Sequence, residues 1–271
     1  MHQKNKDTQK RYEGFLQTNC LWKNDAVYNL SQFEIVTKST KIDIDIDEKL
    51  RLGKYIERFV SYQLEQEINL SIISENIQIQ KEKITLGELD CILLQDKQPI
   101  HLEVIYKFYL YDNTVGTSEI EHFIGPNRKD SLIEKLDKLK EKQLPLLYST
   151  ECINYLETIN LKVEKIKQQV YFKGQLFMPL SKINTDLKTL NSDAITGFYI
   201  NQKELDLFKN DKFFIPVKKD WIIKPHKNVN WLSFDDFKKA TNQYLERKFS
   251  PLCWLKLNNG EIKKFFFVWW P

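Results

Sequence analysis

Three closely spaced β-rich runs that follow an amphipathic helix constrain the fold of this chain more than any other feature. Between residues 49 and 67, apolar side chains recur every three or four positions, which predicts one helix with a buried stripe. The runs 77–80, 86–94 and 100–111 are rich in β-branched and aromatic residues and are separated by polar turn sequence. This region therefore predicts a helix that packs with three strands.

The segments on either side extend this region into an α/β, or α+β, fold around a mixed sheet. Helices are expected at 131–143, which Pro145 ends, and at 152–161, before a strand at 169–177. Other expected elements are a helix within 12–30, a β-rich piece at 33–36, a strand at 213–217, a capped helix from Ser233 and a hairpin of 252–257 with 261–269.

The length of 271 residues allows one elaborated domain or two modest ones. No repeat and no low-complexity linker divides the chain. We therefore expect residues 49–180 to form the core, with 1–48 as an N-terminal extension. Residues 181–271 are expected to form a C-terminal α/β extension packed on that core.

Two patterns admit both a functional and a packing interpretation. The alternating run 42–47 could present a row of carboxylates to a cation, but a period of two is typical of an edge strand with one solvated side, which we favour. The aromatic residues near the C-terminus could stack nucleic-acid bases, but such runs in a terminal strand more often belong to the core. These aromatic residues are Phe265, Phe266, Phe267, Trp269 and Trp270.

Motif searches direct attention to carboxylates. The chain contains neither GxGxxG nor GxxxxGK[ST], so the usual backbone cradles for nucleotides are missing. It also lacks HExxH and GxSxG, and it has only four histidines, all isolated in sequence. The net charge of +4 is too weak to indicate a polyanion partner, so any basic surface must be local.

Cysteine spacing and hydropathy bear on the cellular location. The four cysteines are far apart and form no CxxC pair, which argues against a zinc ribbon or a disulfide framework and favours reduced, mostly buried thiols. No stretch approaches the roughly 18 uninterrupted apolar residues of a membrane span. We expect a cytoplasmic protein with no membrane partner.

Two acidic residues are predicted to face each other across the hairpin of the second and third runs. If the turn centres on Asp96 and Lys97, paired residue numbers sum to 193, and Asp90 then lies opposite Glu103. Carboxylates about 5 Å apart repel by about 3 kcal/mol at an effective dielectric constant of about 20. A bound Mg²⁺ or Mn²⁺ would offset this repulsion, and a proton shared by an inert pair is the alternative.

Two further residues are candidates for this site. Lys107 points to the same face of its strand as Glu103, where it could orient a water or steady a phosphate charge, or simply form a salt bridge. Glu57 falls at the margin of the buried stripe of the helix within 49–67. It is therefore either a half-buried carboxylate that is a candidate for the site or a surface partner of Lys54 or Arg58.

Several segments together carry a resemblance to a known family. They are Leu52 to Glu57, Leu86 to Asp90, Leu102 to Leu110, Gly125 to Arg128 with Lys135, Gln143 to Leu146, and Lys173 to Phe177 with the Phe-rich C-terminal hairpin. These segments resemble the bacterial domain-of-unknown-function 1853 (DUF1853) family, whose members are grouped with the PD-(D/E)XK nuclease superfamily. The resemblance covers nearly the whole chain. The superfamily implies a restriction-endonuclease-like core with the order αβββαβ, which agrees with the order expected here.

The resemblance implies roles for individual residues. Asp90 and Glu103 match the metal-binding positions of the second and third core strands, and Glu57 matches a common extra ligand on the first core helix. The usual lysine lies two residues after the glutamate, where this chain has Ile105. Lys107 comes two residues later, roughly 6 to 7 Å farther along the strand, so either Lys107 reaches back or Lys135 takes over.

The loop 125–130 offers a plausible phosphate contact. Asn127 and Arg128 precede a predicted helix N-terminus, where free amides and a guanidinium favour an anion. The alternative is plain capping of the helix by Asn127 or Asp130, which is the better use of the acidic residue. Together with Lys135, Asn127 and Arg128 are the predicted nucleic-acid contacts.

These features lead to two expected functions. The first is a Mg²⁺- or Mn²⁺-dependent nuclease that hydrolyses DNA or RNA, with Asp90, Glu103 and Lys107 as the catalytic residues. The second is a catalytically inactive, nuclease-like fold that binds nucleic acid or a protein partner, which the shifted lysine and the weak net charge favour. A small-molecule enzyme unrelated to nucleases has no motif to support it.

Overall fold

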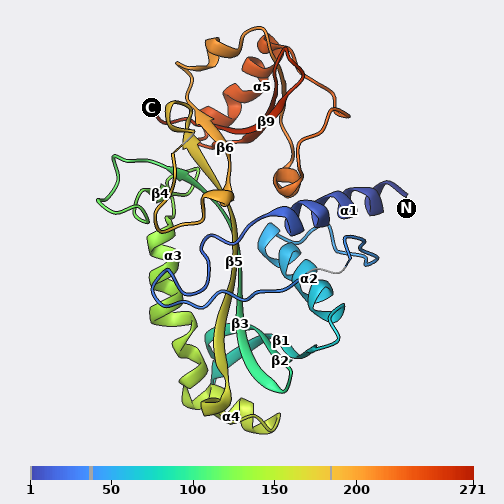
Figure 1. The fold of residues 1–271 in the computed structure, drawn as a ribbon, viewed down its shortest axis with the longest axis vertical. Coiled ribbons are helices and arrows are strands. Elements are labelled where there is room, and N and C mark those ends of the chain that lie inside the picture. Colours follow the sequence, from blue (N-terminus) through green and yellow to red (C-terminus); the bar gives the residue numbers. More distant parts are fainter. Residues whose placement is uncertain (1, 37–38, 184) are drawn as a thin grey trace. The chain divides into compact units, whose positions relative to one another are not determined.

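The computed structural model describes residues 2–36, 39–183 and 185–271 and has a mixed α/β architecture (Figure 1). Its α-helices, five in the described residues, are α1 (His2–Gln17), α2 (Leu52–Glu65), α3 (Leu132–Lys138), α4 (Thr150–Thr158) and α5 (Phe234–Glu246). Its strands are β1 (Leu70–Lys81), β2 (Ile84–Gln95), β3 (Gln98–Tyr111), β4 (Phe123–Ile124), β5 (Lys167–Pro179), β6 (Ile195–Ile200), β7 (Lys212–Phe214), β8 (Leu252–Lys256) and β9 (Ile262–Phe267).

The strands form a mixed sheet, hydrogen-bonded in the order β1-β2-β3-β5-β6-β9-β8-β7, with β4 paired to β3 off this path. The pairs β1–β2, β2–β3 and β8–β9 are antiparallel, whereas β6 is parallel to both β5 and β9. The expected mixed α/β class is confirmed. In the described residues, no helix combines the length and the apolar character that a membrane span requires.

The chain divides into two compact units, each built from segments that are not consecutive in the sequence. Unit 1 contains Met1–Asn19, Phe108–Leu132 and Gly174–Pro271, and unit 2 contains Cys20–Lys107 and Ile133–Lys173. Strands β3 and β5 contribute residues to both units. The expected division into a core of residues 49–180 and two terminal extensions stays a prediction.

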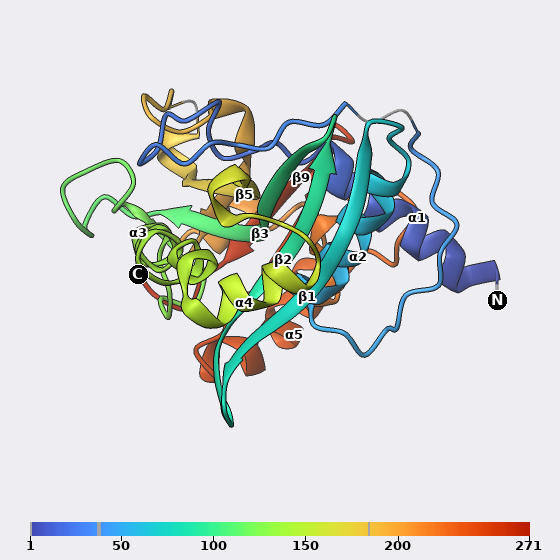
Figure 2. The same cartoon turned by 90° about the horizontal axis from the view of Figure 1, so that it is seen from below.

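In unit 2, β1 and β2 carry helices on both faces (Figure 2). One face packs against α4 and the turn before it, through Ile77, Leu89 and Leu156 among others. On the other face lies α2, whose stripe of Ile56, Phe59, Val60 and Leu64 is buried as its spacing predicts. Contacts from α2 to β1 include the hydrogen bond that Ser61 donates to Glu75.

The β2–β3 hairpin has the predicted register. Asp96 and Lys97 form the two-residue turn with φ angles of 48° and 75°, as a type I′ turn requires. Cys91 then pairs with Leu102, and Ile92 pairs with His101. Both pairs sum to 193, which confirms the register on which the site prediction depends.

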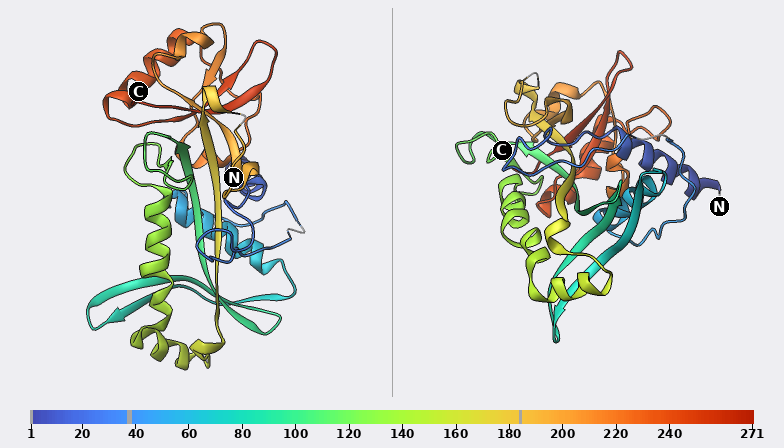
Figure 3. Two further views of the ribbon diagram at one scale, coloured as in Figure 1. Left: turned by 60° about the vertical axis from the view of Figure 1, so that its left-hand side comes forward. Right: turned by 60° about the horizontal axis from the view of Figure 1, so that its bottom comes forward.

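Unit 1 is built around aromatic side chains carried by β7, β9 and α5. These elements lie in the orange to red part of the ribbon in Figure 3. Phe213 stacks on Phe237 with ring centroids 4.3 Å apart, and both rings contact Phe265. The Ser233 hydroxyl accepts a hydrogen bond from the Asp236 amide at 3.2 Å, which confirms the predicted helix cap. Phe265, Phe266, Phe267 and Trp270 are buried, as expected for a core strand.

Three N-terminal expectations are wrong, wholly or in part, in their secondary structure. Helix α1 ends at Gln17, and the chain then turns through Asn24 and Asn29, whose φ angles of 55° and 57° no helix accommodates. Residues 42–47 form no strand, and neither do residues 33–36, although Gln32 makes an isolated bridge to Val170. The aspartates of 42–47 are exposed and Ile46 is buried. The alternation of apolar and acidic residues therefore reflects which side chains are buried, and the segment pairs with no described strand.

Candidate functional site

Asp90 lies where β2 leaves β3. The β2–β3 ladder ends at Cys91 and Leu102, whereas β2 continues to pair with β1 as far as Ile84. Beyond this point the Val104 amide donates a 2.9 Å hydrogen bond to Asp90 Oδ2, so the side chain takes the place of the missing backbone acceptor. On the other side of β2, the β1 residue opposite Asp90 is Asn76, whose backbone is in the left-handed region with a φ angle of 53°.

Glu103 is fully buried, with 0% of its surface exposed, and both of its oxygens accept hydrogen bonds. Gln143 Nε2 donates to Oε2 at 2.5 Å, and His101 Nε2 lies 3.1 Å from Oε1. Gln168 Nε2 lies 3.0 Å from His101 Nδ1, so His101 presents Nε2–H to the glutamate when Gln168 donates. A carboxylate oxygen has two lone-pair positions, so each oxygen of Glu103 keeps room for a further partner.

Lys135 joins this network through Gln143. The helix α3 carries Lys135 and continues as a π-helical turn, Leu139–Gln143, which ends before Pro145. Lys135 Nζ donates to Gln143 Oε1 at 2.6 Å, and Gln143 in turn donates to Glu103. An amide therefore connects a lysine to a buried carboxylate, and π-helical turns are often found at functional sites.

Burial shifts the pKa values of the acid and of the lysine toward neutrality. Burial, reinforced by the negative charge of Glu103, raises the pKa of Asp90 to about 7. Burial lowers the pKa of Lys135 to about 8, although the charges of Glu103 and Asp90 oppose that shift. We call this group, made of Asp90, Glu103, Lys135 and Gln143, the acidic site.

Glu57 is half-buried beside the acidic site but is engaged by Lys54. Lys54 Nζ donates to Glu57 Oε2 at 2.8 Å and to Asn76 Oδ1 at 2.7 Å, and it also contacts Glu88. Burial opposes the charge on Lys54, but the hydrogen bonds to Glu57 and Glu88 outweigh burial and raise its pKa. Burial raises the pKa of Glu57. Pairing with Lys54 is one of the two arrangements expected for Glu57, and a ligand role stays a prediction.

Lys107 lies half-buried on β3, four residues after Glu103. Its positive charge contributes, after burial and the charge of Lys138, to the lowered pKa of Lys135. Lys135 has a hydrogen-bonded connection to Glu103 through Gln143. The catalytic role of Lys107 stays a prediction.

Asn127 and Arg128 lie in unit 1, whereas the acidic site lies in unit 2. Arg128 forms an ion pair with Asp112 at 2.6 Å and lies 4.9 Å from the ring centroid of Trp270. The side chain of Asn127 accepts a hydrogen bond from the Ser250 amide at 2.7 Å. Both side chains thus have partners within their own unit, and contact with nucleic acid stays a prediction for them.

The chemistry of the donors in the acidic site suits a hard cation held by two carboxylates. No group of three or more His, Cys, Asp and Glu side chains in the described residues is arranged to hold a metal ion. Mg²⁺ is commonly held by only one or two carboxylates, with waters and phosphate oxygens as its other ligands. Asp90 and Glu103 meet this requirement, and their mutual repulsion would decrease when a cation binds.

Sequence reasoning missed how Gln143, Gln168 and His101 support Glu103. A neutral amide has no motif of its own, and its partner lies 40 residues away in sequence. The segment around Gln143 carried part of the family resemblance, and the position of His101 on the same strand face as Glu103 was a second signal. Neither signal identified the hydrogen bonds.

The fold and the acidic site define a mixed α/β protein with a buried and a half-buried carboxylate beside a half-buried lysine. Its sequence matches the family model described as a domain of unknown function, DUF1853, over residues 4–268, so the chain belongs to that family. The predicted family is thereby confirmed. No curated protein and no solved structure is significantly similar to the chain.

Proposed function

We propose that this protein is a metal-dependent nuclease of the PD-(D/E)XK type that hydrolyses phosphodiester bonds in DNA or RNA. The observation that carries the proposal is the pair of Asp90 and Glu103 at the point where β2 and β3 part, with the charge of Glu103 raising the pKa of Asp90. Such a pair is costly unless a cation or a proton offsets its charge. Because this repulsion costs free energy, the presence of both carboxylates favours a functional role for the pair.

The order of elements around the pair supports the PD-(D/E)XK assignment. The chain runs α2, β1, β2, β3, then α3 and α4, and returns through β5. This order corresponds to the αβββαβ core of that superfamily, with Asp90 on the second strand and Glu103 on the third. The additional short strand β4 and the π-helical turn are insertions in this comparison.

Asp90 and Glu103 would hold Mg²⁺ or Mn²⁺ through their carboxylate oxygens. When bound, the cation would polarise a phosphate and lower the pKa of a water. His101 and Gln143 fix the orientation of Glu103, as hydrogen bonds to ligating carboxylates commonly do. These hydrogen bonds to Glu103 do not depend on whether Glu57 stays paired with Lys54 or binds the cation.

Lys135 is the best candidate for the lysine function. Its ammonium would steady negative charge on the phosphate, because burial removes the water that screens such a charge elsewhere. Lys135 comes from α3 rather than from β3, which would compensate for Ile105 at the usual lysine position. Lys107 would then contribute to the positive field around the substrate.

A catalytically inactive binding module is the second candidate. The observation that favours it is that the acids already have partners in the protein: both oxygens of Glu103 accept hydrogen bonds, and Glu57 pairs with Lys54. In such a protein a proton on Asp90, rather than a cation, would offset the repulsion. Salt-sensitive binding of DNA or RNA without turnover and without a metal requirement would then be expected.

The test measures binding and cleavage on the same preparations. Calorimetric titration with Mg²⁺ and Mn²⁺ should detect binding to the wild type and none to Asp90→Asn, while Glu88→Gln, outside the carboxylate pair, serves as the control that still binds. Cleavage of labelled single- and double-stranded DNA and RNA should require the cation and disappear in Asp90→Asn. A folded wild type that binds no cation and cleaves none of these substrates would disprove the nuclease.

A further inference from the structure

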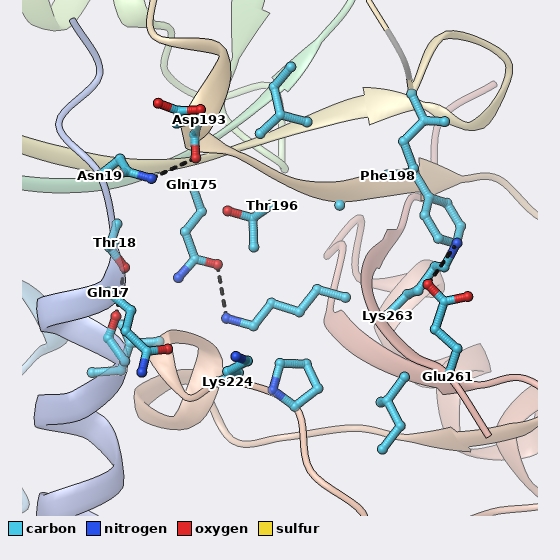
Figure 4. Close-up of a pocket in the computed structure, with 18 residues that line it drawn as sticks. Gln17, Thr18, Asn19, Gln175, Asp193, Thr196, Phe198, Lys224, Glu261 and Lys263 are labelled. Atoms are coloured by element: carbon cyan, nitrogen blue, oxygen red, sulfur yellow. Dashed lines mark hydrogen bonds and ion pairs between the residues drawn. The ribbon is translucent and has the colours of Figure 1, made fainter. Parts of the chain in front are cut away.

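A cavity of about 530 Å³ lies entirely within unit 1, between the end of α1 and the strands β5, β6 and β9 (Figure 4). Its volume is within the range of small-molecule sites. Part of the wall is apolar, from Ile195, Phe198, Ile222 and Ile262. The remaining wall carries amides and hydroxyls, including those of Gln17 and Thr196, which Figure 4 shows among the side chains around the cavity.

Lys264 lines this cavity and is almost completely buried, with 4% of its surface exposed. Its Nζ donates to the backbone oxygen of Trp221 at 2.6 Å and to Gln175 Oε1 at 3.0 Å, the bond drawn from Gln175 in Figure 4. Both acceptors are uncharged. An ammonium has three N–H donors, so these two bonds leave one donor for a further partner.

Among the described residues, no carboxylate forms an ion pair with Lys264. Glu261 forms an ion pair with Lys263 at 3.3 Å, which leaves Lys224 and Asp193 as the remaining charged residues of the lining. Burial alone lowers the pKa of Lys264 to about 7. A buried amine of this kind carries its full charge only when an anion compensates for the lost hydration.

We propose that this cavity binds a small organic anion whose carboxylate or phosphate group meets Lys264 and whose apolar part lies against Ile195, Phe198, Ile222 and Ile262. The anion supplies the counter-charge that the protein itself does not provide. Gln175 holds the ammonium toward the cavity. The site is independent of the acidic site, because all of its residues belong to unit 1.

The first test follows Lys264 itself in the full-length protein. Lysine labelled with ¹³C at Cε is titrated by NMR, and the Lys264 signal is assigned by its loss in Lys264→Met. The probes are benzoate, phenyl phosphate and inorganic phosphate. At least one organic probe should raise the titration midpoint of Lys264 by about one pH unit or more, since an anion favours the charged amine.

The second test measures probe affinity as a function of pH. The charged amine prevails below its pKa, so the dissociation constant of the organic probe should rise by up to about tenfold per pH unit above pH 7. Lys264→Met should weaken binding at pH 6 by at least about tenfold and remove this pH dependence. Lys256→Met, which removes a lysine of the neighbouring strand β8 outside the cavity lining, is the matched control and should bind within about threefold of the wild type.

Each outcome decides between the sources of the anion or rejects the site. A response to benzoate alone identifies a carboxylate ligand, and a response to phenyl phosphate alone identifies an organic phosphate. A response to inorganic phosphate alone would contradict the role of the apolar wall. If the Lys264 signal titrates identically with all three probes in folded wild-type protein, the proposal is wrong, whether or not Lys264→Met folds.

Discussion

The acidic site of unit 2 and the lysine cavity of unit 1 respond to burial in opposite directions. In the acidic site, burial and a neighbouring like charge raise the pKa of Asp90 to about 7, so the site favours a cation or a proton. In the cavity, burial lowers the pKa of Lys264 to about 7, so that site favours an anion or the loss of a proton. One physical cause thus produces two sites of opposite preference in one chain.

The two sites also differ in how their polar groups are satisfied. Glu103 receives hydrogen bonds from His101 and Gln143, and Gln143 connects it to a lysine. Within the described part of the chain, Lys264 donates only to neutral acceptors, Gln175 and the carbonyl of Trp221. An acid supported by several donors keeps a fixed position, which suits catalysis, whereas a lysine without a counter-ion suits the binding of a ligand that brings the charge.

The largest expected effect separates the two sites by activity. Glu103→Gln should reduce Mg²⁺-dependent cleavage by about 100- to 1,000-fold, because it removes one of the two charged ligands. Lys264→Met should leave cleavage within about threefold of the wild type. Rates measured on one labelled substrate for the three proteins check this, and equal losses in both variants would contradict separate roles for the sites.

The next effect is a rise in stability with pH that depends on Lys264. Its pKa is lowered from 10.5 to about 7 on folding, so between these values the unfolded state binds more protons and stability increases with pH. The slope is up to about 1.4 kcal/mol per pH unit. Denaturant unfolding between pH 7 and 10 should show a shallower slope for Lys264→Met, and parallel curves would rule out a buried, uncompensated amine.

A smaller effect of opposite sign is expected for Asp90. Its pKa is raised from 3.8 to about 7 on folding, so between these values the folded state binds more protons and stability falls as pH rises. Because Asp90 is only half-buried, we expect at most about 1 kcal/mol per pH unit. Asp90→Asn should lose this slope between pH 4 and 7, as measured by unfolding without added metal. Saturating Mg²⁺ should reduce the slope in the wild type only.

The smallest effect distinguishes the two lysines near the acidic site. Lys135→Met should reduce cleavage about tenfold, and the decline of activity above pH 8 should disappear, because the Lys135 ammonium has a pKa of about 8. Lys107→Met is the matched control, with an expected change of less than about threefold. If Lys107→Met loses more cleavage activity than Lys135→Met, the catalytic lysine is Lys107 on β3 and not Lys135.

Local sequence patterns predicted the features that depend on neighbouring residues. The turn at Asp96 and Lys97 fixed the register of the hairpin, because a two-residue turn permits only one pairing. The stripe of α2 and the burial of Phe265 and its neighbours followed from periodicity and composition. From these features the sequence predicts that Asp90 and Glu103 lie near each other.

Features that depend on distant residues could not be predicted in this way. The alternation at 42–47 reports which side chains meet water, but strand formation also needs a partner strand, and the sequence does not name one. The parallel pairing of β6 with β5 and β9 brings together distant segments. Lys263 and Lys264 look alike in sequence, and only the packing of β9 decides which of them is buried.

The passage of β3 and β5 through both units determines when each unit can be completed as the chain is synthesised. The chain passes from one unit to the other at 19/20, 107/108, 132/133 and 173/174. All residues of unit 2 exist once Lys173 has been added, whereas α1 must wait for β6 to β9 before unit 1 is whole. All residues of the acidic site are therefore present on the ribosome while the N-terminal helix still lacks the strands that complete its unit.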